Sequence, residues 1–413
     1  GAANRWQTYG RASMAWRISE EKFYPGFMKS INEMKARFAV GQAGNRPGNT
    51  TQYETFSIGT GGVLTPATLG NKNLRPEVAT ETEVGLDMEI LSRYGVTLTY
   101  ARSVTTDQVL LVVPPAASGF NNQWRNAGTL EGTTWETSIN IPLMERREFT
   151  WSARVNADRI RSKITALEIP PTFYGCGGAT CKYQVGIPFP QMWGRRLVQS
   201  CDQMPSAFVA RCGAGKEWQH NDEGLIVWVG AGNTYKEGIT KNLWHAVLPA
   251  ASAPWGMANS WGMPLVVRDD SISGTPKPAK LLPVGHALPD LRWSLGNNVT
   301  WKKFSGYVLM DAVKGKDVYN EELHWSRGDF ATEDSDQLGK TVETAKPIGY
   351  YYRVGAPDAS GVGGLYDVKT SAAHAVEDAS YLKVREISVG YRFGKIAGVG
   401  DWTLSLIGRN LKT

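Results

Sequence analysis

The residues on either side of the turn at 91–95 alternate apolar and polar side chains along both arms. On the first arm the apolar set is Val84, Leu86, Met88 and Ile90, and the set between them is Glu83, Gly85, Asp87 and Glu89. On the second arm Val96, Leu98 and Tyr100 alternate with Thr97, Thr99 and Ala101. A period of two predicts a β-hairpin with one apolar face and one polar face. A soluble sandwich would bury the apolar face, whereas a membrane barrel would turn it to lipid and keep the acids in a wet lumen.

The connections between the predicted strands distinguish these folds, because they alternate in length. The short ones are Leu91–Gly95, Pro142–Glu148, Lys302–Ser305 and Gly394–Asp401, and the long ones run roughly over Thr105–Gly132, Arg161–Pro289 and Asn320–Ser380. Outer-membrane barrels sort their connections in this way, with short turns at one rim and long loops at the other. Aromatic residues also gather beside the short turns, as in an interfacial girdle, although strands favour aromatics in any case. We therefore predict an all-β fold, an antiparallel transmembrane β-barrel with long extracellular loops.

The length and charge of the chain bear on its class. A soluble protein of 413 residues would usually split into two or three domains, whereas a large barrel takes this length as one unit. No segment approaches the ~20 apolar residues of a membrane helix, and a barrel strand needs only ~9–11. The net charge of +6 is spread without runs of like charge, so we expect no nucleic-acid partner. Both ends read as strands, and the N-terminus lacks a signal-peptide pattern, so we expect a piece of a longer chain.

Composition divides the chain into three segments. Residues 1–168 carry barrel strands with their loops, and residues 290–413 carry further strands with one long loop over 320–380. Residues 169–289 between them hold all four Cys and many Trp, Gly and Pro residues. We expect this segment to be a long extracellular loop insertion, and its length predicts internal structure.

The four cysteines of the insertion are candidates for disulfides. Cys176 and Cys181 lie close together in the segment CGGATC, and Cys201 and Cys212 follow. Four cysteines allow three pairings, of which we favour the two local ones, as staples of an exposed loop in an oxidising environment. Zinc ligation is the alternative, but the usual two-residue spacing is absent and no histidine follows at a matching interval. Free thiols are a further alternative.

The tryptophans of the insertion have two candidate roles. They are Trp193, Trp218, Trp228, Trp244, Trp255 and Trp261. Exposed rings would stack on a sugar ligand or anchor a partner protein. The same rings would equally serve as a small core for the loop itself, because a loop of this length needs something to bury.

The sequence predicts no catalytic, cofactor-binding or metal site. The histidines are scattered and form no HExxH motif or i, i+4 pair. The segments GAGK at Gly213–Lys216 and GKT at Gly339–Thr341 do not complete the spacing of a phosphate-binding loop. No Ser/His/Asp arrangement is defensible, so we expect that the protein is not an enzyme.

Several phrases resemble those of the TonB-dependent outer-membrane receptors, and in particular the SusC/RagA branch. The segment NLRPEVATETEVGLD (Asn73–Asp87) resembles the receptors' LxPExxxxxExGxD phrase. Others follow in the family's order, namely SMAWRISEEKF (Ser13–Phe23), KARFAVGQAGN (Lys35–Asn45), FNNQWRNAGTLEGTTWE (Phe120–Glu136), KFSGYVLMDAVKGKDVYN (Lys303–Asn320), DASYLKVREISVGYRF (Asp378–Phe393) and SLIGRNL (Ser405–Leu411). Together they span nearly the whole chain apart from the two long insertions.

This resemblance implies a fold, a location and an activity. The chain would be the C-terminal portion of a large, about 22-stranded barrel in the outer membrane of a Gram-negative-type bacterium. The family imports oligosaccharide or peptide nutrients, and its partners are TonB, which contacts an N-terminal segment missing here, and a surface lipoprotein lid like SusD. The barrel exterior would meet outer-membrane lipid, and the lumen would hold Glu83, Asp87, Glu89, Arg154 and Asn156. The Cys-bearing insertion departs from the family pattern.

Two other functions remain open at this stage. The first is an outer-membrane structural or interaction protein whose long loops bind a partner protein assembly. The second is a soluble secreted β-sandwich that binds glycans.

Overall fold

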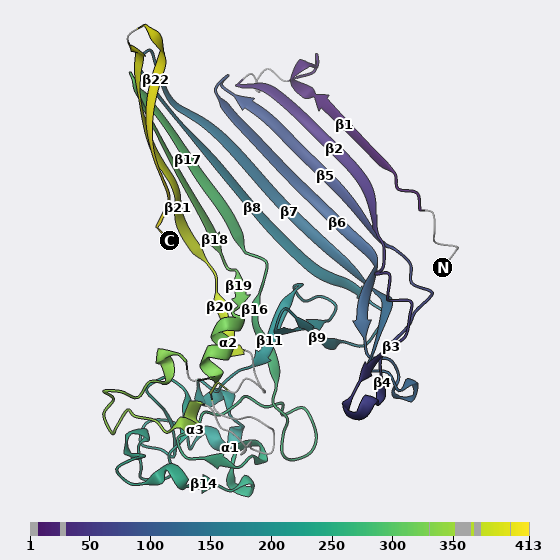
Figure 1. Cartoon of the computed structure of the whole chain (residues 1–413), viewed down its shortest axis with the longest axis vertical. Helices are drawn as coiled ribbons and strands as arrows, with labels where there is room; N and C mark the ends of the chain where they lie inside the picture. Colours follow the sequence, from purple (N-terminus) through teal and green to yellow (C-terminus); the bar gives the residue numbers. More distant parts are fainter. Residues whose placement is uncertain are drawn as a thin grey trace.

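The computed structural model describes residues 7–24, 30–329, 331–351, 365–366, 373–396 and 398–412. Its main feature is a curved, open wall of long strands that lean in the same direction (Figure 1). The wall follows the order β1-β2-β5-β6-β7-β8-β17-β18-β21-β22, and each strand pairs antiparallel with the next. The bounds are Arg11–Arg17, Ile31–Asn45, Glu77–Ile90, Tyr94–Val112, Asn122–Arg146, Phe149–Leu167, Leu291–Trp301, Phe304–Lys314, Tyr381–Ile396 and Val399–Lys412 in that order.

The pairing register gives the wall two chemically different faces. Residues directly opposite each other on paired strands point to the same face. One such row runs from β2 to β21 and is entirely apolar: Met34, Met88, Val96, Ile139, Val155, Leu295, Met310 and Val384. The next row points the other way and is entirely polar: Lys35, Asp87, Thr97, Ser138, Asn156, Ser294, Asp311 and Lys383. The alternation seen in one hairpin therefore extends across the sheet.

The apolar face is not covered by other parts of the chain. Val84, which the sequence assigned to this face, is 50% exposed, and Leu98 on the neighbouring strand is 39% exposed. A soluble sandwich would bury these side chains against a second sheet. A row of large apolar residues open to the surroundings is instead what a wall facing lipid requires, since lipid offers no hydrogen bonds to polar groups.

Most connections separate by length between the two rims of the wall; the exception is the one between β1 and β2, residues 18–30, which is longer than 113–121 but joins strand ends at the rim of the short turns. The short turns, at residues 91–93, 147–148 and 302–303, lie at one rim together with the β21–β22 turn. The long connections, at residues 46–76, 113–121, 168–290 and 315–380, lie at the other rim (Figure 1). This confirms the predicted barrel architecture with its sorted loops. Of the loop over 320–380, residues 330, 352–364 and 367–372 lie outside the described part.

The predicted bounds of several connections were too wide because the strands continue further than expected; β8, for example, runs to Leu167, past the expected end before Arg161. β6 extends to Val112 and β7 begins at Asn122, so the connection expected over Thr105–Gly132 shortens to 113–121. Residues 108–112 of β6 continue the pairing ladder with residues 123–128 of β7, and β6 stops where two prolines without N–H donors follow Val113. The turn expected from Pro142 also shortens, since Pro142 stays within β7 next to a bulge in its pairing with β8.

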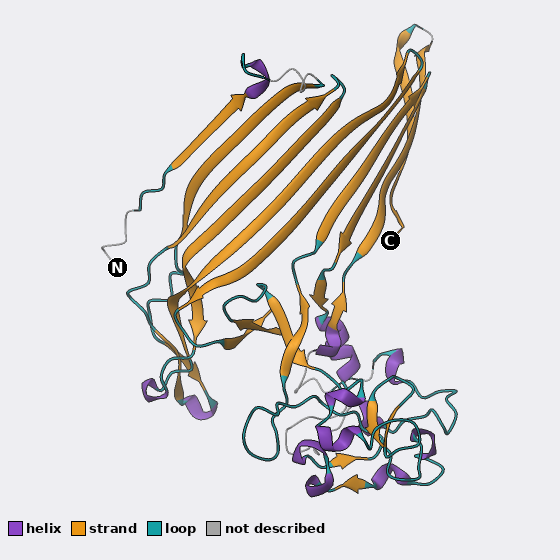
Figure 2. Ribbon diagram, turned by 180° about the vertical axis from the view of Figure 1, so that it is seen from behind, coloured by secondary structure: helices purple, strands orange, loops and turns teal. Residues whose placement is uncertain are grey.

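The remaining strands and helices lie outside the wall, most of them beyond the long-loop rim (Figure 2). The strands are β3 (Thr55–Ile58), β4 (Leu64–Leu69), β9 (Thr172–Cys176), β10 (Ala179–Tyr183), β11 (Gln191–Arg195), β12 (Trp218–His220), β13 (Ile226–Trp228), β14 (Val247–Leu248), β15 (Asn259–Ser260), β16 (Leu281–His286), β19 (Asp317–Tyr319) and β20 (Val376–Asp378). The α-helices are α1 (Ser206–Val209), α2 (Glu321–Gly328) and α3 (Ile348–Tyr351). None of the described helices has the length and apolar composition needed to span a membrane.

The best-buried core of the molecule lies in the loops and not in the wall. Val198, Trp218 and Ile226 are 0% exposed and belong to one cluster within the segment 198–265. The middle of the wall holds few buried side chains, because a single sheet has no protein layer against its outer face. The wall and the loops therefore depend on different interactions, the wall on pairing and lipid and the loops on their own hydrophobic packing.

A charge placed on the outer face tests this assignment. Leu98→Arg would put a cation at the middle of the apolar band, and we expect it to lower the free energy of unfolding in bilayers by about 2–4 kcal/mol. Thr97→Arg, one residue away, points to the polar face and serves as the matched control, with an expected loss below about 1 kcal/mol. The measurement is urea unfolding of the complete gene product in lipid vesicles. Equal losses for the two variants would contradict the assignment of faces.

Candidate functional site: the polar wall and the loop module

The polar face of the wall carries paired charges close to its first strands. Arg37 on β2 lies between two acids of β5, with its Nε 2.9 Å from an oxygen of Asp87 and its Nη1 3.1 Å from an oxygen of Glu83. Lys35 lies 3.3 Å from the same carboxylate of Asp87. The guanidinium crosses the strand over Gly85, where a Cβ atom would lie 2.6 Å from its Nη2. Gly85 thus leaves the space in which this charge network forms.

A second set of paired charges lies on the same face at the later strands. Asp311 of β18 accepts a hydrogen bond from Nη2 of Arg385 at 3.0 Å and another from the hydroxyl of Tyr381 at 3.1 Å. Between the two sets, Arg292 and Asp158 form an ion pair at 2.8 Å. Charges of both signs therefore alternate along the polar face, each held by a partner on a neighbouring strand. These groups are suited to hydrogen bonding with a polar ligand or a polar plug.

At the long-loop rim a small sheet packs against the same face of the wall. The sheet has the order β16-β11-β10-β9 and places Tyr174 and Tyr183 against Leu110, Val112 and Ile164 of the wall. Ile164 points to the polar face of the wall, because it lies two residues after Ser162 on β8 and Ser162 pairs with Gly132 on that face. The apolar end of β6 is therefore covered by this sheet.

The tyrosines of this contact form a stacked group. The rings of Tyr174 and Tyr183 are 3.9 Å apart and inclined by 7°, and Phe189 stacks beside both. Burial raises the pKa of Tyr183, and burial together with the neighbouring Tyr183 raises the pKa of Tyr174. Both hydroxyls therefore stay neutral at physiological pH. The stack holds the inserted sheet at the mouth of the wall.

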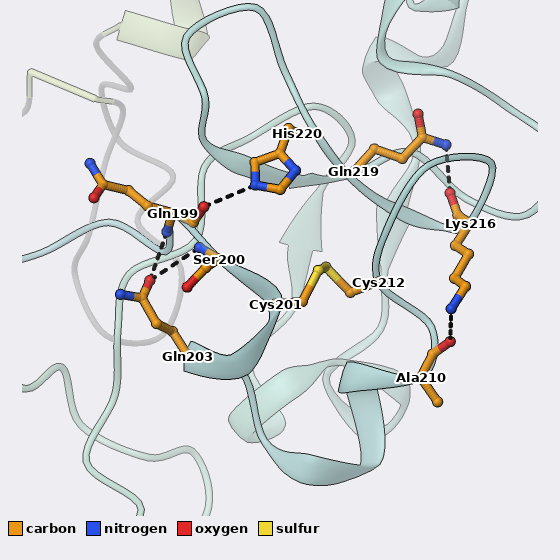
Figure 3. Close-up of a disulfide and its surroundings, with 9 residues drawn as sticks. All are labelled: Gln199, Ser200, Cys201, Gln203, Ala210, Cys212, Lys216, Gln219 and His220. Carbon is orange, nitrogen blue, oxygen red and sulfur yellow. Dashed lines mark hydrogen bonds between the residues drawn. A yellow bond between two sulfur atoms is a disulfide. The ribbon is translucent and has the colours of Figure 1, made fainter.

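The structure contains two disulfides in the insertion. One joins Cys176 to Cys181, across the turn between β9 and β10, and the other joins Cys201 to Cys212 (Figure 3). These are the two local pairings that the sequence favours. Beside the second disulfide, the side chain of Gln203 accepts hydrogen bonds from the backbone N–H groups of Gln199 and Ser200. The bond and these contacts fix the chain around the large loop core.

The tryptophans of the insertion divide between core and surface positions. Trp218, Trp255 and Trp261 are buried, and they form the loop's own core, which leaves no face of these rings open for stacking on a ligand. Trp228 is partly buried between the same clusters. Trp244 meets Trp261 edge to face at 4.9 Å, in a contact that the absence of a side chain at Gly238 permits.

Trp193 occupies a different place, on the small sheet. Its ring meets that of Phe173 edge to face at 5.9 Å, and the ammonium of Lys182 lies over both rings, 4.6 Å from the centroid of Trp193 and 5.1 Å from that of Phe173. Phe173 is 41% exposed. Trp193, Phe173 and Lys182 therefore form a partly exposed aromatic surface on the face of the sheet opposite the wall contact.

The second long loop completes a joint loop module with the insertion. Lys346 is 8% exposed and reaches the carboxylate of Asp222 at 2.7 Å and that of Glu223 at 3.5 Å. The hydroxyl of Tyr350 donates to Glu223 at 2.5 Å and accepts from the side-chain amide of Asn221 at 2.7 Å. Apolar contacts of Tyr350 with Met263 continue this contact surface. Lys346 and Asp222 are 124 positions apart in the sequence, so their contact joins two distant segments into one unit.

Comparisons with known proteins agree with this architecture. The sequence profile of the family TonB dependent receptor-like, beta-barrel, matches residues 1–194. A TonB-dependent receptor of Formosa agariphila is 24% identical over 430 residues, which cover 99% of this chain and 38% of that protein. Over residues 1–194 the wall matches the barrel of TonB-dependent receptors. The chain spans well under half of the curated relatives that it matches along its length.

The similar proteins also include SusC and the RagAB importer. TonB-dependent receptor SusC of Bacteroides thetaiotaomicron is 29% identical over 182 residues, which cover 40% of this chain and 18% of SusC. A solved structure of the RagAB peptide importer in its closed-closed state superposes with a TM-score of 0.61 at 16% identity, covering 100% of this chain and 40% of that one. At this identity the superposition shows the fold. The family match and the similarity to SusC assign the barrel to the outer membrane of Gram-negative bacteria, with the long-loop rim outside.

Several residues of the polar face and of the loop module were not identified from the sequence. Arg37 alternates with apolar residues in β2, and this pattern places it on the polar face once the strand is recognised. Lys346, Asp222 and Tyr350 carry no such signal, because they lie in irregular segments whose contact depends on the tertiary structure. Glu83 and Asp87, which we expect in the lumen, lie on the polar face, where both acids bind Arg37 of the neighbouring strand.

The disulfide pairing is testable on the protein isolated from its membrane without reductant. Mass spectrometry of unreduced, alkylated peptides is expected to recover Cys176 linked to Cys181 and Cys201 linked to Cys212, because the sulfur atoms of each pair are bonded in the structure. Reduction before alkylation is the control and should yield all four cysteines in modified form. Alkylation of all four thiols without reduction would show that the pairing is wrong.

The contact between the two loops should weaken at alkaline pH. Burial opposes the charge of Lys346, but the hydrogen bond to Asp222 and the charge of Glu223 outweigh it, so the pKa of the ammonium lies above 10.5. Burial also raises the pKa of Tyr350, helped by Glu223. A group whose pKa is raised on folding stabilises the folded contact at pH values below its unfolded pKa. This stabilisation is lost as the pH rises through the raised pKa of the folded state.

Limited proteolysis of the loops against pH measures this effect. We expect the loops to resist cleavage up to about the ordinary pKa of lysine, ~10.4, and to become sensitive above it. Lys346→Arg is the informative variant, because a guanidinium keeps its charge in this range and should move the onset to higher pH. Lys280→Met, an exposed position away from the contact, serves as control. Identical profiles for the wild type and Lys346→Arg would exclude the lysine as the titrating group.

Proposed function

We propose that the complete receptor imports oligosaccharide or peptide nutrients across the outer membrane, and that this chain supplies part of its barrel and its external loops. The names of the similar proteins support this proposal, since one is SusC and another is described as a peptide importer. In keeping with the family of receptors and transporters, we predict no enzymatic activity.

The observation that carries the proposal is the balanced polarity of the inner face. Lys35 and Lys383 at the two ends of the polar row match Asp87 and Asp311 within it, so the row has no net charge. A channel that selected ions of one sign would carry a ring of one charge. Alternating donors and acceptors are instead suited to neutral sugars or to peptides, whose hydroxyl and amide groups need partners of both kinds.

The loop module provides the external part of the proposed uptake site. We propose that residues 169–289 act as one structural unit with the described parts of the loop over 320–380. The surface formed by Phe173, Lys182 and Trp193 would offer stacking and a positive charge to a cargo molecule or to a lipoprotein lid like SusD. Energy would come from TonB through an N-terminal segment that precedes this chain in the complete receptor.

A second function is favoured by one observation. The insertion has its own core of buried Trp218, Trp255 and neighbours together with a disulfide, which is more structure than a passive connector needs. Such a rigid external unit would suit an outer-membrane interaction protein whose loops bind a partner assembly. In that case the barrel would anchor the loops without transporting anything.

Uptake measurements on cells separate the two functions. A strain that lacks the gene should lose energised uptake of one class among fluorescent oligosaccharides and peptides, and complementation should restore it. We expect collapse of the proton-motive force to reduce uptake in the complemented strain to the level of the deletion. Replacing residues 169–289 by a short Gly/Ser linker should impair uptake while the barrel still assembles. Unchanged uptake of every cargo in the deletion strain, with loss of a bound protein on loop replacement, would favour the second function.

A further inference from the structure

The outer face of the wall changes character beyond one pair of aromatic residues. On β7 the large apolar side chains of this face end at Trp135, which is 60% exposed and whose ring centroid lies 4.6 Å from that of Tyr100 on β6. Rings at such a position mark the boundary between hydrocarbon and headgroups in outer-membrane barrels. Because the long-loop rim lies just beyond, this boundary belongs to the outer leaflet.

Basic residues occupy the outward positions at and just beyond this boundary. Arg159 of β8 is directly opposite Trp135 in the pairing. The next outward row contains Arg102, Thr133 and Arg161, and the row after it contains Glu131 and Lys163. We call Arg102, Arg159, Arg161 and Lys163 the outward basic patch. All four residues share the face of the apolar row, because the register between these strands has no bulge from Trp135 to Glu131.

The outward basic patch keeps an excess of positive charge. Arg102 forms an ion pair with Glu131 at 2.7 Å, and Arg161 forms one with Asp290. Among the residues that the structure describes, no acid lies within ion-pairing distance of Arg159 or Lys163, and both are exposed. Two arginine–acid pairs and two further cations leave a net charge of two positive units at the level of the lipid headgroups.

We propose that the outward basic patch binds the phosphate groups of outer-leaflet lipid. The patch faces away from the lumen, so a cargo molecule inside the barrel cannot reach it. Strand residues rise ~3.3 Å each along tilted strands, so the patch runs over four positions of β8 outward from the hydrocarbon edge, at the level of the lipid phosphates. Arg binds phosphate oxygens with two parallel hydrogen bonds, and Lys adds a mobile point charge. The patch thereby fixes the depth of the barrel and its lipid neighbours independently of any transported cargo.

Lipid binding by the complete gene product tests this proposal. The probe is fluorescently labelled bisphosphorylated lipid A in mixed detergent micelles, and dissociation constants are measured by titration. The variant Arg102→Gln, Arg159→Gln, Lys163→Gln removes three cations from the patch. Each cation near an anionic lipid surface contributes about fivefold in affinity, so the triple variant should bind roughly 100-fold more weakly. Lipid A without phosphate should bind the wild type as weakly as the variant binds the phosphorylated lipid.

A matched control removes the same charge from the other rim. The variant Arg146→Gln, Arg147→Gln, Lys303→Gln changes three exposed cations beside the short turns and should leave lipid A binding unchanged. Heat-modifiable migration in SDS gels checks that both variants form the barrel. Inorganic phosphate at the concentration of the lipid should not displace it, since the hydrocarbon chains hold the headgroup at the wall. Equal binding by the two triple variants, or equal affinity for lipid with and without phosphate, would overturn the proposal.

Discussion

The backbone of a chain in lipid must satisfy every N–H and C=O group without water, and the wall of this receptor is organised by that requirement. Its strands pair in chain order, so that strands β2 to β21 each have a hydrogen-bonded neighbour on both sides. Once the pairing is fixed, each side chain points to one of two faces of the sheet. The row through Met88 is apolar and the row through Asp87 is polar, so the two faces differ in chemical character. The two faces follow from the same hydrogen-bonding ladder, since a shift of one residue would exchange them.

The loop module meets the opposite requirement, because it lies in water and must generate its own stability. Trp218 and Ile226 are fully buried there, in contrast to Val84 and Leu98 of the wall. A core of aromatic rings, two disulfides and the contact between Lys346 and its acids replace the support that lipid gives to the wall. The joint module contacts the wall through the stacked tyrosines, so barrel and loops are coupled where cargo would enter.

The extent to which sequence predicts this structure depends on which physical signal each part carries. Alternation with a period of two is visible in the hairpin around Leu91–Gly95, and it predicted the strands, the faces and the sorting of connections between the rims. The ends of β6 and β7 could not be predicted. Beyond the bilayer the regular alternation of apolar and polar residues ends, although the two strands stay hydrogen-bonded to each other. The contact of Lys346 with Asp222 depends on two irregular loops meeting in space, and no local pattern records it.

A single strand shows how closely the environments follow one another along this wall. On β8, Val155 belongs to the apolar row, Arg159 lies opposite the boundary Trp135, and Ile164 is covered by the inserted sheet. The strand thus passes from hydrocarbon through headgroups to a protein core between positions 155 and 164, which are nine positions apart. Val155 and Ile164 have similar hydrophobicity, and they lie on opposite faces only because their numbers differ in parity. Composition along a barrel strand therefore carries little information, whereas register relative to its neighbours determines what each side chain meets.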